Sequence, residues 1–490
     1  MRAMKTSLIT LSVFIFCLFT MQACSFEDGF DHIDADFSSH TDVLTRSDCS
    51  EKNLYASSIL KDKIITEEFV PVILSDFIDK SLFKDVDRYS IQKVTKGNKN
   101  LMYVVNFDKG GWVIISGRFN VDNIILASGS EGRFDPNQID CPEVRFWLEM
   151  TEEMVNNELE EDEVLDEEEN VRSGPYDNEP YVWVRIPIGY VNSSSLLSCV
   201  DPLTITKWSQ GWPWNYKTPF VNGYKTPLGC FPVAAAQLIV YLHNTIGHPA
   251  GRYRQIDTSF TWNGYDGYVS HVTRSDYSNN WYVMALENPG FQSSLTDNVG
   301  DLIIDVGDRF QATYSYPYTS TSVYSYNNFS YFGLSCSLKD YDSYYDVDEV
   351  ISNLESDLPV IMNGWKSNVS VNINKIGHAW LIDGYKKYHN ISDYQQYLRI
   401  IPTDSLSWYT NLGYDAIYTD SEKESLYPGI EEYEIIHNET HYYPVQFHMN
   451  WGHGGTYNDY YSITPATWIT DTPNAYKYGL KIMYDFVSIE

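Results

Sequence analysis

Four short stretches of the sequence carry side chains that could build a nucleophilic active site. Cys230 follows Gly229 and opens an apolar, alanine-rich run, 231–242, which predicts a buried helix with Pro232 in its first turn. The dipole of a helix favours a thiolate at its N-terminus, and a nearby imidazolium would lower the thiol pKa further. A single cysteine in such a run is more often a buried structural residue, so this stretch does not decide the matter alone.

A histidine at the entrance to an apolar strand could be the partner of that thiol. His378 precedes 379–382, a stretch that predicts a buried strand ending in a turn at Asp383 and Gly384. A strand would hold the imidazole rigidly, as a general base or imidazolium partner requires. A lone histidine in this setting is more often a satisfied core residue.

A third stretch offers a group that could orient the imidazole. The side chain of Asn450 could accept the proton of the His378 ring nitrogen that faces away from the sulfur, and Trp451 could shield that bond from water. His448 and His453 lie close by, but no carboxylate stands at a recognised metal-ligand spacing from them. We therefore expect neither a metal nor a cofactor.

A fourth stretch could stabilise an oxyanion. Gln210 lies twenty residues before Cys230, and its side-chain NH₂ could donate to an oxyanion together with the backbone N–H of Cys230. Taken alone, a glutamine on a surface loop is the simpler interpretation. The four stretches together favour acyl-transfer chemistry at Cys230.

Composition and charge restrict the class of protein that positions these groups. The chain has 490 residues, 34 Lys+Arg and 66 Asp+Glu, a formal charge of -32, and 43% hydrophobic and 15% aromatic residues. Disorder requires low hydrophobicity with high charge, and nucleic-acid binding requires basic surfaces, so neither is expected. The length allows two or three folded domains.

The N-terminus resembles an export signal. Arg2 and Lys5 precede a short apolar run, 8–19, that is too short to span a bilayer. Ala23 and Cys24 close this segment as in a bacterial lipobox, in which Cys24 would be lipidated and become the first residue of the mature protein. Cleavage by the ordinary signal peptidase is the alternative. We expect an exported protein, lipid-anchored to the bacterial cell envelope or released outside the cell.

The cysteines outside the signal do not predict a disulfide framework or a zinc site. They are odd in number, widely spread, and contain no CxxC pair. They are Cys49, Cys141, Cys199, Cys230 and Cys336.

The remaining sequence divides into a smaller and a larger α+β domain. After a polar tether, 25–65, the stretch 66–160 contains two predicted strands, 101–107 and 112–116, around an Asp-Lys-Gly-Gly turn, then a strand at 124–129 and a helix at 142–159. In 158–169, nine of twelve residues are acidic, which predicts a linker at 161–185 or, alternatively, an exposed extension of the helix. The larger domain occupies 186–490.

Taken in order, these motifs resemble the streptopain family of bacterial cysteine peptidases, within the papain-like clan. The resemblance covers most of the chain from about Glu67, and Cys230 and His378 stand 148 residues apart, close to the papain-like spacing. It rests on Trp208-Ser209-Gln210, Gly229-Cys230 with the Ala-Ala-Gln-Leu-Ile run, Leu358 to Gly364, Gly377 to Tyr385, and Asn450-Trp451-Gly452 with Gly454-Gly455.

The resemblance implies a papain-like two-lobed peptidase domain preceded by an inhibitory propeptide domain, which is cut away on activation. The stretches 104–107 and 111–116 are similar to that propeptide, and the acidic stretch 158–169 is a candidate region for the cut. The sequence departs from the family in three places: Phe231 and Pro232 replace small residues, 117–120 replaces a more acidic turn, and His453 stands where a second Trp is common.

The sequence thus predicts an exported cysteine endopeptidase, made as a zymogen, that hydrolyses proteins through an acyl-enzyme intermediate. Protein substrates and its own propeptide are the expected partners, and the membrane is reached only through a lipid on Cys24. Two alternatives stay open. One is a Cys/His amidase or acyltransferase acting on cell-wall peptide, and the other is a non-catalytic surface lipoprotein that binds through its many Tyr and Trp side chains.

Overall fold

The structure is a computed structural model that describes residues 53–55, 64–76, 88–118, 124–168, 181–246, 256–262, 265–271, 294–341, 346–365, 377–407, 416–418, 420–462 and 478–489. The predicted signal segment with Cys24 lies outside the described residues, as do most of the tether and residues 169–180.

In the N-terminal domain, the side chains of one strand feed two separate apolar clusters. Along β3 (Lys99–Phe107), Tyr103 and Val105 belong to one cluster, whereas Met102 and Val104 belong to the other. Because side chains alternate along a strand, the two clusters lie on opposite faces of the sheet. Helix α2 (Val70–Asp76) contributes to the first cluster and α3 (Pro142–Glu168) to the second.

This domain is an antiparallel sheet in the order β5-β4-β3-β2. The predicted hairpin is confirmed as β3 and β4 (Trp112–Ser116), with Asn106 opposite Trp112, and the predicted third strand as β5 (Ile125–Gly129). β2 (Tyr89–Lys96) completes the sheet, and the 3-10 turn η2 (Glu67–Phe69) leads into α2.

Helix α3 continues further than the favoured interpretation of the acidic stretch allowed. It begins at Pro142, as predicted, and runs through Glu168, so residues 161–168 are helical rather than a linker. The alternative, a helical extension, describes this part of the stretch. The first half of the helix is stabilised by burial of Val144, Trp147 and Leu148 at helical spacing. The helix continues past them because Glu and Leu, which make up most of the following residues, have high helix propensity.

The larger, C-terminal domain is built on a sheet in the order β11-β18-β12-β13-β16-β17. Its strands are antiparallel to their neighbours. Their bounds are β11 (Leu334–Asp340), β12 (Val360–Trp365), β13 (Gly377–Pro402), β16 (Val445–Asn450), β17 (Asp459–Ser462) and β18 (Tyr478–Ser488).

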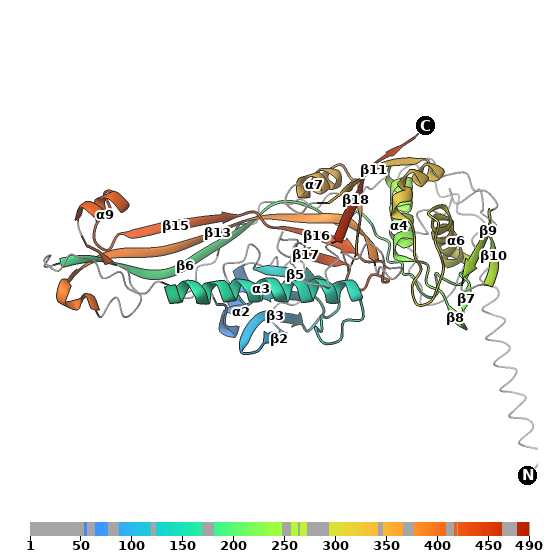
Figure 1. The fold of residues 1–490 in the computed structure, drawn as a ribbon. Helices are drawn as coiled ribbons and strands as arrows, with labels where there is room; N and C mark the ends of the chain where they lie inside the picture. The colour runs from blue at the N-terminus through green and yellow to red at the C-terminus, as the bar shows by residue number, and fades with distance from the viewer. Residues whose placement is uncertain are drawn as a thin grey trace, which may run out of the picture. The chain divides into compact units, whose positions relative to one another are not determined.

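Two helices form a second apolar core with one face of this sheet. α4 (Cys230–Ile246) and α6 (Ser294–Arg309) bury Val233, Leu238 and Ile303 with Leu381 of β13. The 3-10 segment η4 (Val323–Phe332) adds Phe329, and α7 (Val347–Glu355) packs in the cluster that also receives α3. The sheet therefore has helices on both faces, and α4 is fixed against the strand that carries His378 (Figure 1).

The sheets of the two domains are continuous. β17 pairs with β5 in antiparallel register, with Tyr460 opposite Ser128 and Tyr461 opposite Ala127. The N-terminal, propeptide-like domain thereby covers what would otherwise be an exposed strand edge of the sheet of the larger domain.

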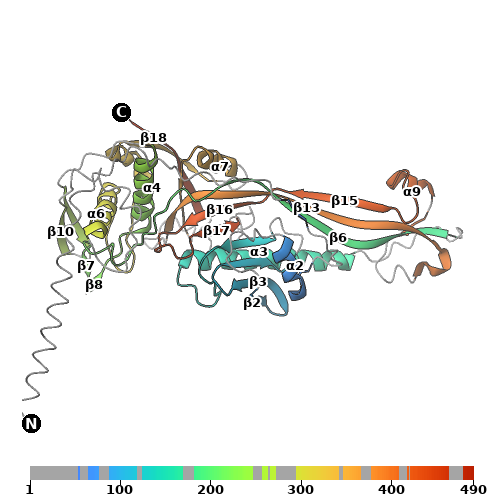
Figure 2. The ribbon, with the colours of Figure 1, turned by 180° about the vertical axis from the view of Figure 1, so that it is seen from behind.

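Three long strands form a ribbon beyond the part of the sheet that carries His378. β6 (Tyr181–Val200) and β15 (Ile435–Tyr442) both pair with β13, and α9 (Asp420–Leu426) lies at the end of the ribbon (Figures 1 and 2). Because β13 runs from Gly377 to Pro402 as one strand, the turn predicted at Asp383 and Gly384 is wrong. A bulge at this point lets Asp383 leave the regular register while the strand continues.

The ribbon also receives two short strands. β14 (Ala416–Ile417) pairs with β6, and so does β1 (Asn53–Tyr55), which lies within the stretch expected to be a tether. Cys199 on β6 is disulfide-bonded, which the cysteine count did not predict.

The remaining elements are short. They are β7 (Phe220–Val221), β8 (Tyr224–Lys225), β9 (Ile256–Trp262), β10 (Tyr265–His271) and η5 (Thr403–Ser405). Within the described part of the chain, none of the helices has the length and apolar character needed to cross a membrane.

Candidate active site

Cys230 is the first residue of α4, as the sequence predicts. Gly229 precedes it with φ +99, and a Cβ there would lie 3.2 Å from Thr319 and 3.3 Å from Pro232, so this position favours glycine. Burial raises the pKa of the Cys230 thiol to about 11, and the charge of Glu143 adds to the rise. Backbone N–H groups of Ala379, Phe231 and Cys230 itself act in the opposite direction, because they donate to the sulfur.

The predicted stretches meet around this cysteine. The N–H of Leu228 donates to the carbonyl of Gln210 at 2.9 Å, which fixes Gln210 to the segment that enters α4. Ser209 forms a β-bridge with His453, and the N–H of Gly454 donates to the carbonyl of Trp208 at 3.0 Å. The backbone N–H of Ala379 donates to the sulfur of Cys230, so the start of β13, which carries His378, also lies at this cysteine.

His378 is buried near the start of β13, opposite Gly364 of β12. Its ring lies nearly parallel to that of Trp380, at 6.0 Å and 13°. The nitrogen Nδ1 lies 3.0 Å from Oε1 of Glu143, a residue of the propeptide-like domain. The imidazole is therefore held by a carboxylate from outside the larger domain.

Asn450 is buried at the end of β16 and belongs to a separate hydrogen-bond network. Its Nδ2 donates to the carbonyl of Thr206 at 3.1 Å and to Oε1 of Gln237 at 3.2 Å, and its Oδ1 accepts from the N–H of Gly452 at 3.3 Å. Among the described residues, none of these bonds reaches His378. The predicted role of Asn450 in orienting the imidazole stays a prediction.

The predicted roles of Trp451 as a shield and of Gln210 as an oxyanion donor stay predictions. The buried ring of Trp451 lies 6.4 Å from the ring of His378 and 5.3 Å from that of Trp380. Gln210 is partly buried, and its carbonyl accepts a hydrogen bond from the N–H of Leu228, two residues before Cys230.

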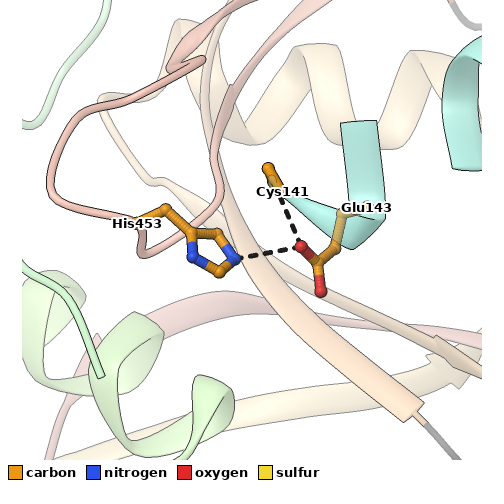
Figure 3. A group of neighbouring side chains, drawn as sticks. All are labelled: Cys141, Glu143 and His453. Atoms are coloured by element: carbon orange, nitrogen blue, oxygen red, sulfur yellow. Dashed lines mark hydrogen bonds and ion pairs between the residues drawn. The ribbon is translucent and has the colours of Figure 1, made fainter. Parts of the chain in front are cut away.

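Glu143 is the functional residue that sequence reasoning missed. It lies in the first turn of α3 and is 7% exposed. Besides His378, it contacts His453, whose Nε2 lies 3.0 Å from Oε2, and Cys141, whose sulfur donates to the same oxygen at 3.1 Å (Figure 3). Pro142 in the sequence marks a helix start, but nothing there shows that this helix end faces the histidine.

The charge of Glu143 is maintained despite its burial. Burial alone would raise the pKa of this carboxyl, but the charge of His378, with the hydrogen bond and charge of His453, outweighs it and holds the pKa well below its usual range. An ionised carboxylate therefore faces both the histidine and the thiol of the candidate pair.

Asp383 organises the strand just beyond His378. Its Oδ2 accepts from the N–H of Thr204 at 3.1 Å, and its Oδ1 lies 2.6 Å from Nδ1 of His448. His448, one of the two histidines for which the sequence offered no carboxylate at a metal-ligand spacing, is thus paired with a carboxylate. His453 is the one that lies with Cys141 and Glu143 in a group able to hold a metal ion.

Comparisons with known proteins confirm the predicted resemblance. Residues 208–419 match the model of the Peptidase C10 family, and residues 65–155 match the model of the Spi protease inhibitor. Among solved structures, the chain is similar to a fragment of Prevotella intermedia prointerpain A, at 15% identity and a TM-score of 0.47, over 81% of this chain and 98% of that one. The active wild-type Prevotella intermedia interpain A cysteine protease matches at 16% identity and a TM-score of 0.38, over 58% of this chain and 94% of that one. A search of curated proteins gave no match.

Proposed function

Since this chain is a cysteine peptidase of the C10 family that carries an inhibitory propeptide domain, we propose that it is an exported endopeptidase whose nucleophile is Cys230. The predicted α+β fold, with a propeptide domain before the peptidase domain, is confirmed. The observation that supports Cys230 most directly is its place at the start of α4, where the N–H of Ala379, the neighbour of His378, donates to its sulfur.

In the active enzyme, Cys230 attacks the scissile carbonyl as a thiolate and forms an acyl-enzyme, which water then hydrolyses. His378 protonates the leaving amine, and Asn450 orients the imidazole once Glu143 has left it. The backbone N–H of Cys230 and the side chain of Gln210 stabilise the oxyanion. Trp451 shields the histidine from water.

In the zymogen, Glu143 keeps the pair inactive in two ways. Its carboxylate accepts from Nδ1 of His378, and its negative charge disfavours a thiolate at Cys230. Removal of the propeptide takes this charge away and frees the histidine for the sulfur. A cut within 158–168 would require α3 to unwind there, because these residues are helical.

Substitution of either member of the pair tests the proposal. Cys230→Ala and His378→Ala should each abolish hydrolysis of casein and of a fluorogenic peptide while the fold, followed by circular dichroism, is retained. Cys336→Ser is the matched control, because Cys336 is also a free, partly buried cysteine but lies on β11. Hydrolysis that persists at the parent rate in Cys230→Ala or His378→Ala would end the assignment.

The alternatives are separated by substrate and by labelling. Activity on a cell-wall digest but not on casein would favour the amidase or acyltransferase. Failure of a thiol-directed peptide inhibitor to react selectively with Cys230 would favour the binding lipoprotein.

The proposal includes export and a lipid on Cys24, supported by the lipobox-like end of the N-terminal apolar segment. The parent protein should then fractionate with membranes and dissolve in detergent. A Cys24→Ser protein that still fractionates with membranes would contradict the lipid anchor.

A further inference from the structure

Three different metal-binding side chains meet at the contact between the propeptide domain and the peptidase domain. Cys141 and Glu143 stand at the start of α3, and His453 lies in the loop after β16 (Figure 3). A donor atom of each lies within 4.8 Å of the donors of the other two. Oε2 of Glu143 lies between the other two donors, 3.1 Å from the sulfur of Cys141 and 3.0 Å from Nε2 of His453.

The donor set suits zinc. Thiolate, imidazole and carboxylate are the three ligand types that Zn²⁺ binds in proteins, and three protein ligands with one water is a common arrangement. Metal–ligand bonds of about 2.0–2.3 Å place the donors of a tetrahedral site about 3.4 Å apart. The distances from Oε2 of Glu143 to the Cys141 sulfur and to Nε2 of His453 therefore need to lengthen by only a few tenths of an ångström.

The three side chains differ in their exposure to solvent. Cys141 is 2% exposed and Glu143 is 7% exposed, whereas the side chain of His453 is 30% exposed. His453 is therefore the ligand through which solvent is in contact with the site. The buried thiolate and carboxylate together carry two negative charges, which a divalent cation neutralises.

We propose that Cys141, Glu143 and His453 form a zinc site that locks the propeptide onto the peptidase domain. On binding, the Cys141 thiol releases its proton to solvent, and the proton on Nε2 of His453 also leaves that nitrogen through solvent, so that Nε2 can bind the ion. Zn–S, Zn–N and Zn–O bonds then form with no change in oxidation state. The ion takes Oε2 of Glu143, and Oε1 stays on His378, so one carboxylate joins the ion to the catalytic histidine. The effect on latency rests on the proposed function, whereas the binding of zinc does not.

Zinc content tests the site in a protein that cannot process itself. The full-length Cys230→Ala zymogen, which lacks the catalytic thiol, is loaded with zinc chloride, freed of excess by gel filtration and analysed by mass spectrometry for metal. We expect one zinc per chain, and the same from a further Cys336→Ser substitution, which removes a free cysteine outside the site. Adding Cys141→Ser or His453→Gln should weaken binding by about a hundredfold or more, since even groups outside the ligand set contribute 10–100-fold.

Cobalt supplies a readout that a change in folding does not imitate. Co²⁺ in the Cys230→Ala zymogen should give a thiolate-to-cobalt charge-transfer band, which Cys141→Ser removes and His453→Gln shifts or weakens. Zinc should also raise the melting temperature of the Cys230→Ala zymogen, but not after Cys141→Ser or His453→Gln is added. No zinc in the Cys230→Ala zymogen, or zinc retained equally after Cys141→Ser and His453→Gln, overturns the site. Because Cys230 is absent throughout, neither result bears on the peptidase assignment.

Discussion

At the scale of single residues, the state of the Cys230 sulfur follows from opposed local effects. Burial and the charge of Glu143 favour the thiol, and three backbone N–H groups favour the thiolate. The balance leaves a pKa of about 11, so the sulfur carries a proton at neutral pH, as a latent nucleophile should. Of these effects on the Cys230 pKa, the charge of Glu143 is the one that is removed together with the propeptide.

Glu143→Gln should therefore weaken latency. The amide keeps the size of the side chain but loses the charge that holds His378. A hydrogen bond to a charged group contributes about 1.5–3 kcal/mol, so the initial rate of peptide hydrolysis by unprocessed zymogen should rise roughly tenfold or more. Glu149→Gln, an exposed position on the same helix, should leave the rate unchanged. Equal initial rates in the two variants would contradict the role of Glu143.

At the scale of elements, the propeptide is held by strand addition. β5 pairs with the edge strand β17, which places Gly129 against the side chains of Asp459 and Trp112. A Cβ on Gly129 would lie 2.5 Å from Oδ2 of Asp459 and 2.5 Å from Nε1 of Trp112. The close approach of the two domains at this strand therefore depends on a residue without a side chain.

Gly129→Ala should loosen the junction between the domains. Relief of the clash requires Trp112 or Asp459 to move, and overpacking of this kind costs about 1–3 kcal/mol. The urea midpoint of the zymogen should fall and its initial peptidase activity should rise. Ser128→Ala, one position earlier on β5, is the control. A Gly129→Ala protein as stable and as latent as this control would be evidence against the strand junction.

At the scale of the whole zymogen, propeptide and peptidase share one apolar core. Trp147 of α3 packs edge-on against Tyr461 of β17 at 5.0 Å, and its Nε1 donates to the carbonyl of Ser462. Phe447 and Trp451 of the peptidase domain belong to the same cluster. Since the core crosses the junction, we expect the two domains to unfold together before the propeptide is cut.

The same junction predicts a pH dependence. Burial raises the pKa of the Asp459 carboxyl to about 8 from its usual 3.8, helped by Glu131 and opposed by His448, the N–H of Ser130 and Lys207. Between these values the folded chain holds a proton that the unfolded chain releases, so stability falls as pH rises from about 4 to about 8.

Asp459→Asn should remove this contribution. The difference in urea midpoint between about pH 5 and about pH 9 should be smaller in Asp459→Asn than in the parent. Asp108→Asn, in the exposed β3–β4 turn, should keep the difference found in the parent. If the urea midpoints of the parent and of Asp459→Asn changed equally with pH, the Asp459 carboxyl would not be protonated in the folded chain at neutral pH.

Local chemistry in the sequence determined much of this protein. The position of Cys230 at a helix start, the β3–β4 hairpin and the start of α3 follow from Pro232, the turn glycines and Pro142, which act over a few residues. The resemblance to a peptidase family with a propeptide also followed from short motifs, since each motif is a local arrangement.

Tertiary structure decided the contacts between residues that are far apart in the chain. Glu143 and His378 meet because β5 joins the edge of β17, and no local pattern encodes the pairing of two strands more than 300 residues apart. For the same reason the sequence did not reveal that His453 meets Cys141. The long ribbon was missed because a bulge at Asp383 looks, in one dimension, like the end of a strand, and only the pairing of β13 with β6 shows that the strand continues.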